Sequence, residues 1–173
     1  NSFSPLQMVK YISMLANGGK NVDTTIIKTI QNSNGTEVSR DEINKYVNNK
    51  LGLSDDKTEN LNISQENLNA ILEGMKSVTS ETGGTAYNIF KNFNIEVGGK
   101  TGSAEAGKNV NAWFAGFAPF DDPEIAIVVM VENGGHGNYT AEAVRDIMAE
   151  YFGMNSENVQ EDMTVLPDTQ ILN

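Results

Sequence analysis

The chain is poor in the side chains that build covalent cross-links and metal sites. Its 173 residues contain no cysteine and a single histidine, His136. A disulfide framework is therefore excluded, and one histidine without a second histidine or a cysteine does not make a zinc site. The absence of cysteine suits an extracytoplasmic protein that avoids stray disulfides, but cytosolic proteins share it equally well. No metal site is expected.

Positive charge is scarce as well. The chain has 12 Lys and Arg residues against 23 Asp and Glu residues, which gives a formal net charge of −11. Since no basic residues cluster to meet phosphates, nucleic acid is not expected as a partner. No apolar run is long enough to cross a bilayer. Hydrophobic residues make up 39% of the sequence, which is enough for the core of one domain.

The most informative stretch is the tetrad Lys100-Thr101-Gly102-Ser103. If residues 95–103 form an edge strand beside a cleft, Lys100 offers a cation and Thr101 a hydroxyl. Gly102 offers a bare backbone that a ligand can approach closely. The backbone N–H of Ser103 can point at the oxyanion of a tetrahedral intermediate. These groups together suit a peptide that ends in a carboxylate.

Two other interpretations of the tetrad are weaker. The four residues could form an ordinary polar turn, which the flanking sequence argues against. Gly99-Lys100-Thr101 also looks like the end of a phosphate-binding loop. That motif needs a glycine five residues before Gly99, and Asn94 stands there.

The pattern around the tetrad predicts an α/β (α+β) domain in which an antiparallel sheet is covered by helices. Residues 111–119 and 124–132 read as two strands that continue a meander from the tetrad strand. Because the run Ile125–Val131 is apolar on both faces, it is expected to be a central strand. Residues 140–152 have the 3.6-residue period of an amphipathic helix that ends at Gly153 and closes on the sheet.

The N-terminal part is expected to be more irregular. Helices are predicted over residues 6–15 and from the Ser64 cap onward, and a β-branched strand over residues 24–30. Residues 36–63 carry few apolar side chains and are interpreted as a surface insertion with one short helix at about 41–50. Residues 156–173 are expected to form an acidic tail.

Several stretches in the right order resemble one family. They are residues 4–8, 15–19, 73–78, 84–86, 97–105, 111–119, 125–137 and the closing helix. Together they resemble the C-terminal half of the transpeptidase domain of class B penicillin-binding proteins, over about residues 3–153. The resemblance implies a penicillin-binding/serine β-lactamase-like transpeptidase fold, present as a C-terminal partial domain over residues 1–155.

The resemblance also implies a function. Such proteins cross-link peptidoglycan: a serine attacks the D-Ala-D-Ala bond of one stem peptide, and the acyl group passes to an amine on a second. β-Lactam antibiotics imitate the first peptide, and no cofactor is needed. By resemblance, Lys100 and Thr101 hold the carboxylate and tune the catalytic hydroxyls, Gly102 keeps the strand accessible, and Ser103 supplies the oxyanion N–H. A D,D-carboxypeptidase, a β-lactamase and a non-catalytic penicillin sensor are the alternatives.

The family's other two motifs, Ser-x-x-Lys and Ser-x-Asn, are not found in good form. The one literal Ser-x-x-Lys match runs from Ser54 to Lys57, lies in an acidic stretch, and has no Ser-x-Asn between it and Lys100. We therefore expect the nucleophile to lie upstream of this chain, in an N-terminal remainder against which it packs. The isolated chain is expected to be inactive. By resemblance, the parent is anchored at the outer face of the bacterial cytoplasmic membrane, in contact with a cell-wall synthesis complex.

Two further residues are candidates for substrate contact. Alternation along the strand from Lys100 onward favours Trp113, rather than Phe114, as the residue that lies near the cleft. His136 sits in a glycine-rich loop that is expected to border the cleft, where a structural or substrate-rim role is favoured over catalysis.

Overall fold

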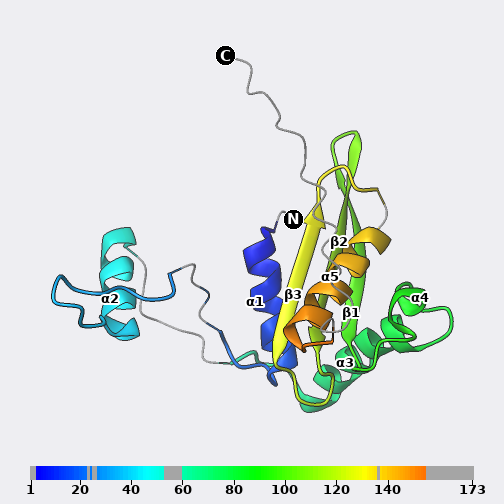
Figure 1. The fold of residues 1–173 in the computed structure, drawn as a ribbon, viewed down its shortest axis with the longest axis horizontal. Helices are drawn as coiled ribbons and strands as arrows, with labels where there is room; N and C mark the ends of the chain where they lie inside the picture. The colour runs from blue at the N-terminus through cyan, green and yellow to red at the C-terminus, as the bar shows by residue number, and fades with distance from the viewer. Residues whose placement is uncertain (1–2, 23, 25–26, 53–59, 136, 155–173) are drawn as a thin grey trace.

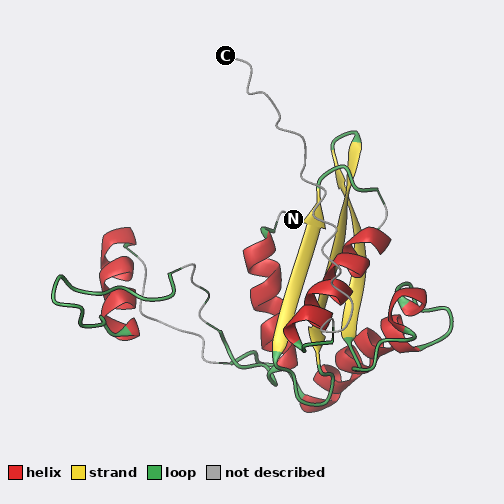
Figure 2. Ribbon diagram, viewed as in Figure 1, coloured by secondary structure: helices red, strands yellow, loops and turns green. Residues whose placement is uncertain are grey.

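The computed structural model describes residues 3–22, 24, 27–52, 60–135 and 137–154. Its centre is a three-stranded antiparallel sheet in the order β1-β2-β3, with helices on both faces (Figures 1 and 2). The strands are β1 (Gly98–Ala106), β2 (Asn109–Ala118) and β3 (Ile125–Val131). The helices are α1 (Pro5–Ala16), α2 (Arg40–Leu51), α3 (Gln65–Ser80), the short α4 (Tyr87–Phe90) and α5 (Asn138–Tyr151).

The sheet separates two apolar layers, because successive side chains of β2 point to opposite faces. Phe114 and Ala118 enter the layer that α4 and α5 cover, together with Val144 and Met148 of α5. The opposite layer is covered by α1 and α3. Its buried members are Ile12, Leu15, Leu68, Met75, Ala115 and Phe117. The meander, the closing helix and the helix-covered sheet predicted from the sequence are confirmed.

Helices α1, α2 and α3 each begin at a serine whose side chain caps the helix, and α5 has no side-chain cap. Ser4 accepts a hydrogen bond from the Gln7 backbone N–H, and the Gln7 side chain accepts one in return from the Ser4 backbone. Ser64 caps α3 as expected. Within the described residues, no helix is both long and apolar enough to span a bilayer.

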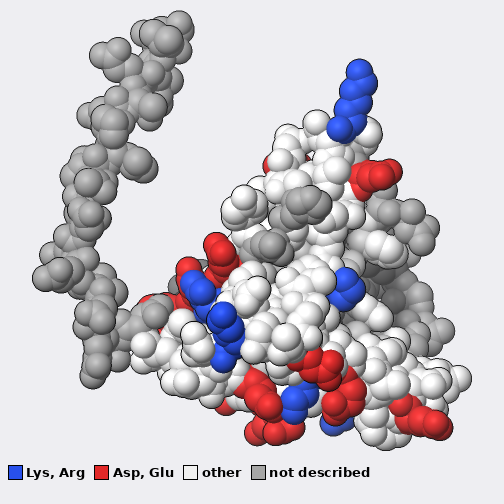
Figure 3. Space-filling model, turned by 90° about the vertical axis from the view of Figure 1, so that its right-hand side faces the viewer, with Lys and Arg blue, Asp and Glu red and all other residues white. Residues whose placement is uncertain are grey.

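Charged side chains are unevenly spread over the face that carries α4 and β1. Most of the described surface in this view is uncharged, and acidic side chains gather toward its lower end, at the level of α3 and α4 (Figure 3). The sequence as a whole has nearly twice as many acidic as basic residues, 23 against 12. Lys and Arg side chains lie among the acidic ones on this face (Figure 3).

Strand β1 is pressed unusually close to the aromatic rings of both layers. A Cβ atom at Gly98 would lie 2.5 Å from the Phe117 ring, and one at Gly99 would lie 2.4 Å from the Phe114 ring. Since real Cβ atoms do not approach other atoms so closely, only glycine fits at either position. The two glycines thus allow the tetrad strand to pack closely against the aromatic rings of both core layers.

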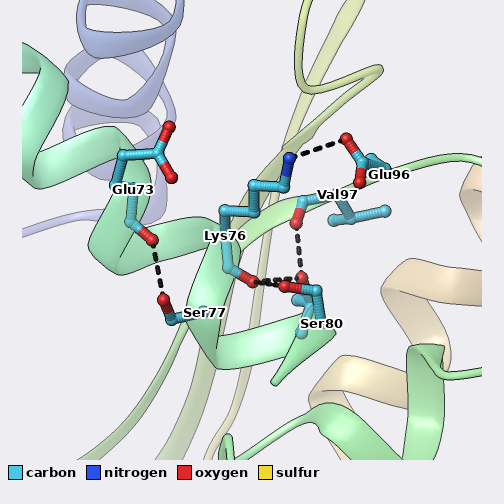
Figure 4. Close-up of polar contacts among 7 residues, drawn as sticks. Glu73, Lys76, Ser77, Ser80, Glu96 and Val97 are labelled. Atoms are coloured by element: carbon cyan, nitrogen blue, oxygen red, sulfur yellow. Dashed lines mark hydrogen bonds and ion pairs between the residues drawn. The ribbon is translucent and has the colours of Figure 1, made fainter.

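The C-terminal end of α3 holds the backbone that leads into β1 (Figure 4). The hydroxyl of Thr79, which is 3% exposed, donates to the Val97 carbonyl oxygen as well as to the Lys76 carbonyl oxygen of its own helix. The Lys76 ammonium forms an ion pair with Glu96 at 2.9 Å and lies 4.9 Å from the Phe120 ring centroid. The hydrogen bond that Lys76 donates to Glu96, reinforced by the charge of that carboxylate, raises the pKa of Lys76. Helix and strand are therefore joined at two adjacent residues.

Helix α2 stands apart from the sheet and its covering helices (Figure 1). It confirms the short helix predicted at about 41–50 and extends one residue beyond it at each end, and Ser39 and Glu42 form a capping box at its start. The guanidinium of Arg40 donates to the carbonyl oxygens of Ile27 and Lys28, at 2.8 and 2.9 Å. These bonds tie the helix to the extended segment before it. That residues 36–63 are an insertion stays a prediction.

Two expectations about strands are wrong. Residues 24 and 27–30 form no strand, because no strand among the described residues pairs with them; an isolated bridge joins Gln31 to Glu37 just after them. Among the described residues, β3 is an edge strand of the sheet and not a central one. Its two apolar faces are explained by α1 and the α5 layer, which cover it from opposite sides. Ser54, His136 and residues 156–173 lie outside the described residues.

Replacing Thr79 with valine should destabilise the protein by about 1–3 kcal/mol, because the buried Val97 carbonyl would lose its hydroxyl donor. Ser80→Ala is the matched control, since the Ser80 hydroxyl also donates to the Lys76 carbonyl oxygen but is exposed. That variant should change stability by no more than about 0.5 kcal/mol. Thermal or urea unfolding of each variant measures the difference, and equal effects would contradict the anchoring role.

Candidate functional site

A cavity of about 830 Å³ opens on the α1 and α3 side of the sheet. Side chains of α1 and α3 form one wall, among them Tyr11 and Met75, and the β1–β2 hairpin forms the other. All four residues of the tetrad Lys100–Ser103 line this cavity, and Trp113 lies beside them. The structure thus brings together the five predicted site residues that it describes.

The hydrogen-bonding pattern of the hairpin leaves part of the tetrad backbone unpaired by β2. In an antiparallel ladder, pairs that exchange two hydrogen bonds alternate with pairs that exchange none. The two-residue turn makes Ala106 and Asn109 the first bonded pair, so Gly102 is bonded to its partner Trp113. Thr101 and Ser103 fall between bonded pairs. Their N–H and C=O groups therefore point away from β2, toward the outer edge of the sheet.

The pairing also decides which side chains face the cavity. Gly102 lies directly opposite Trp113, and a Cβ atom at Gly102 would come within 3.2 Å of the Trp113 Cβ. The indole N–H of Trp113 is buried and has no hydrogen-bond partner among the described residues. Phe114, in contrast, is 0% exposed and belongs to the opposite layer. Trp113 therefore lies nearer the cavity than Phe114, as the alternation predicted; its role stays a prediction.

Polar groups of the tetrad engage one another and one outside residue. The Lys100 ammonium donates to the Thr101 carbonyl oxygen at 2.6 Å, which agrees with a carbonyl that points to the open edge. The Thr101 hydroxyl lies 2.8 Å from the hydroxyl of Thr85, in the connection between α3 and α4. Lys100 forms no ion pair within the described part of the chain, so its charge is available to an anion.

The start of α5 supports the tetrad from the opposite face of the sheet. A Cβ atom at Gly137 would lie 2.8 Å from the Trp113 carbonyl oxygen and 3.1 Å from that of Gly102. Only glycine allows the backbone to pack so closely over this pair. The loop before α5 is fixed nearby, because the Gly135 N–H donates to the Val110 carbonyl oxygen at 3.0 Å. The paired residues Gly102 and Trp113 are thus packed against the start of α5 on the face of the sheet opposite the cavity.

Sequence reasoning missed Thr85 as a member of the site. The stretch Gly84-Thr85-Ala86 belongs to the sequence that resembles the family, but nothing in its spacing indicates that it reaches Thr101. The contact depends on the turn after α3. In that turn, a Cβ atom at Gly84 would lie 2.4 Å from the Ser77 carbonyl oxygen.

Comparison with known proteins gives consistent results. A family model described as "Penicillin binding protein transpeptidase domain" matches residues 2–149. Penicillin-binding protein H of Bacillus subtilis is 34% identical over 142 residues, covering 76% of this chain and 18% of the relative. Peptidoglycan D,D-transpeptidase MrdA of Haemophilus influenzae is 26% identical over 175 residues, covering 91% of this chain and 25% of the relative.

Solved structures agree with the sequence relatives. Pseudomonas aeruginosa PBP2, in a crystal structure with WCK 5153, superposes with a TM-score of 0.69 at 27% identity. The match covers 86% of this chain and 29% of that one. Penicillin-binding protein 2B of Streptococcus pneumoniae has the same fold, with a TM-score of 0.65 at 23% identity over 90% of this chain and 26% of that one.

The matched relatives are much longer than the chain, which spans 18% of one and 25% of the other. Its fold is the penicillin-binding transpeptidase fold, present as part of a domain. Because the family model covers most of the sequence and both kinds of relatives agree with it, this chain belongs to the transpeptidase domain family of class B penicillin-binding proteins.

Proposed function

We propose that this chain supplies the substrate-holding wall of the active site in a peptidoglycan D,D-transpeptidase. One observation carries the proposal: the whole tetrad Lys100–Ser103 lines a single cavity along an edge strand, with hydrogen-bonding groups of its backbone turned outward. The substrate would be a stem peptide that ends in D-Ala-D-Ala. β-Lactam antibiotics would occupy the same place.

The open edge of β1 suits an extended peptide. A peptide laid beside the strand can pair with the outward N–H and C=O groups of Thr101 and Ser103 as an added strand. Gly102, between them, presents no side chain to the cavity. Backbone hydrogen bonds would thus orient the peptide along β1 without depending on its side chains.

The end of the peptide would be held by charge. The Lys100 ammonium has three N–H donors and uses one on the Thr101 carbonyl oxygen. Its remaining donors can meet a terminal carboxylate, and the Thr101 hydroxyl can add a further hydrogen bond. Since the chain is acidic overall, this local cation gives the anionic end of a stem peptide one defined position.

The reaction would proceed by acyl transfer. A serine attacks the carbonyl carbon between the two D-alanines, and the Ser103 N–H donates a hydrogen bond to the developing oxyanion. Collapse breaks the C–N bond, and the terminal D-alanine leaves after its nitrogen takes a proton. An amine of a second stem peptide then attacks the serine ester, forms the new amide and returns the hydroxyl. Water in place of that amine would give hydrolysis.

The attacking half of the site would come from elsewhere in the protein. The only Ser-x-x-Lys sequence in the chain, at Ser54, lies in a polar, acidic stretch, and no Ser-x-Asn stands between it and Lys100. We therefore propose that the nucleophile and its lysine lie in an N-terminal remainder. The whole protein would work on the outer face of the cytoplasmic membrane, beside its peptidoglycan substrate and within a cell-wall synthesis complex.

Replacing Lys100 with methionine in the complete protein should lower the second-order rate of acylation by penicillin about 10- to 100-fold. The change keeps the apolar stem and removes the charged donor, whose hydrogen bonds are worth about 1.5–3 kcal/mol. Lys108→Met is the matched control, because Lys108 lies in the turn of the same hairpin, away from the cavity-lining residues. Stopped-flow or gel-based acylation gives both rates. A loss of less than twofold at Lys100 would remove it from the carboxylate site.

Labelling with a fluorescent penicillin tests the position of the nucleophile. The complete protein should carry a covalent, hydroxylamine-sensitive label, and the isolated chain should carry none. Ser54→Ala in the complete protein should leave the label unchanged. If the isolated chain is labelled, or if Ser54→Ala abolishes the label, the nucleophile lies in this chain. The proposal that it lies in an N-terminal remainder is then wrong.

A further inference from the structure

The hydroxyls of Thr85 and Thr101 form one hydrogen bond, in which either oxygen can be the donor. The two Oγ1 atoms are 2.8 Å apart, although the residues are 16 positions apart in the sequence. Each hydroxyl has one proton to donate and lone pairs that accept. At this distance one of the two must donate and the other accept. Which one donates decides whether Thr101 keeps a free proton.

The position of Thr85 is fixed by its neighbours on both sides. Gly84 packs against the last turn of α3 so tightly that a Cβ atom there would lie 2.5 Å from the Val78 carbonyl oxygen. Ala86 is 1% exposed, and its N–H donates to the same carbonyl oxygen at 3.0 Å. Thr85 therefore projects from a short segment that is held at both ends.

The same helix end also fixes the strand that carries Thr101. The Thr79 hydroxyl donates to the Val97 carbonyl oxygen, and Lys76 is paired with Glu96. Both anchors lie just before β1. Thr85 and Thr101 are thus mounted on one framework, and their contact is more than the chance meeting of two surface side chains.

The chemistry of an anionic ligand determines which of the two hydroxyls donates the hydrogen bond. A carboxylate only accepts hydrogen bonds, and the Lys100 ammonium only donates them. If Thr101 donated to Thr85, it would turn lone pairs toward the carboxylate and repel it. If Thr85 donates to Thr101, the Thr101 proton is free for the carboxylate, and the two bonds reinforce each other. Only this direction satisfies all three groups.

We infer that Thr85 is a positioning residue, which donates to the Thr101 hydroxyl and thereby aims the Thr101 proton at the carboxylate of the bound ligand. The inference rests on the function proposed above and extends it to a residue outside the tetrad. Thr85 would not touch the reacting bond. Its effect should therefore appear only with ligands that carry the carboxylate.

The test compares a penicillin with its methyl ester as acylating agents of the complete protein. In the parent protein the carboxylate form should react faster, and the ratio of the two rates measures recognition of the carboxylate. Thr85→Val keeps the shape of the side chain and removes the hydroxyl. It should lower this ratio about three- to tenfold, the effect of one hydrogen bond, while the rate with the ester stays within twofold. Thr85→Ser keeps the hydroxyl and should retain the ratio.

The outcomes separate a failure of this inference from a failure of the proposed function. A parent protein that penicillin does not acylate, or that shows no preference for the carboxylate form, overturns both. A parent with the preference and a Thr85→Val variant with an unchanged ratio overturns only the role of Thr85. Equal loss with acid and ester would mean a merely structural role and would also overturn it. Thr85→Ala removes the same hydroxyl with less bulk and replaces valine if that variant does not fold.

Discussion

The contact between strand β1 and two phenylalanine rings is the constraint on which the rest of the site depends. Gly98 sits against Phe117 of one apolar layer, and Gly99 sits against Phe114 of the other. The strand is thereby gripped at one point from both faces of the sheet, immediately before Lys100. Any side chain at either glycine would push β1 away from β2 and shift the tetrad relative to α3. Close packing, which transmits such displacements, therefore sets the geometry of a polar site.

The end of α3 positions the two segments that carry the hydroxyl groups of Thr101 and Thr85. Its last two turns hold the backbone before β1 through Thr79 and Lys76, and they hold the Thr85 segment through the Val78 carbonyl oxygen. One rigid helix end thus positions two hydroxyl-bearing segments that are distant in sequence. These supports are a buried side-chain hydrogen bond, an ion pair and a backbone hydrogen bond within the chain, and none of them needs a ligand. Under the proposed function, the groups that hold the carboxylate would thus be arranged in advance, which would lower the entropy lost on binding.

The sequence predicted what is local and missed what depends on distant partners. The tetrad, the meander and the closing helix follow from motif and period, and the cavity beside Trp113 follows from strand alternation. Residues 24–30 have a strand-like composition, yet a strand forms only where a neighbour accepts its hydrogen bonds. Both faces of β3 are apolar because helices cover them. This pattern does not indicate how many strands lie beside β3, so the prediction of a central strand failed. The contact of Thr85 with Thr101 needs the turn at Gly84, and no periodicity encodes it.

The tetrad and Trp113 bring several hydrogen-bond donors to the cavity. They are the Lys100 ammonium, the Thr101 hydroxyl that we infer to be oriented by Thr85, the Ser103 N–H and the buried Trp113 indole N–H. A wall of donors recognises a ligand rich in acceptors, such as a peptide carbonyl followed by a carboxylate, and stabilises negative charge that develops on it. It does not by itself supply a nucleophile activated by a neighbouring base, which needs an acceptor for the nucleophile's proton. Under the proposed function, the nucleophilic hydroxyl and its base would therefore come from the wall opposite.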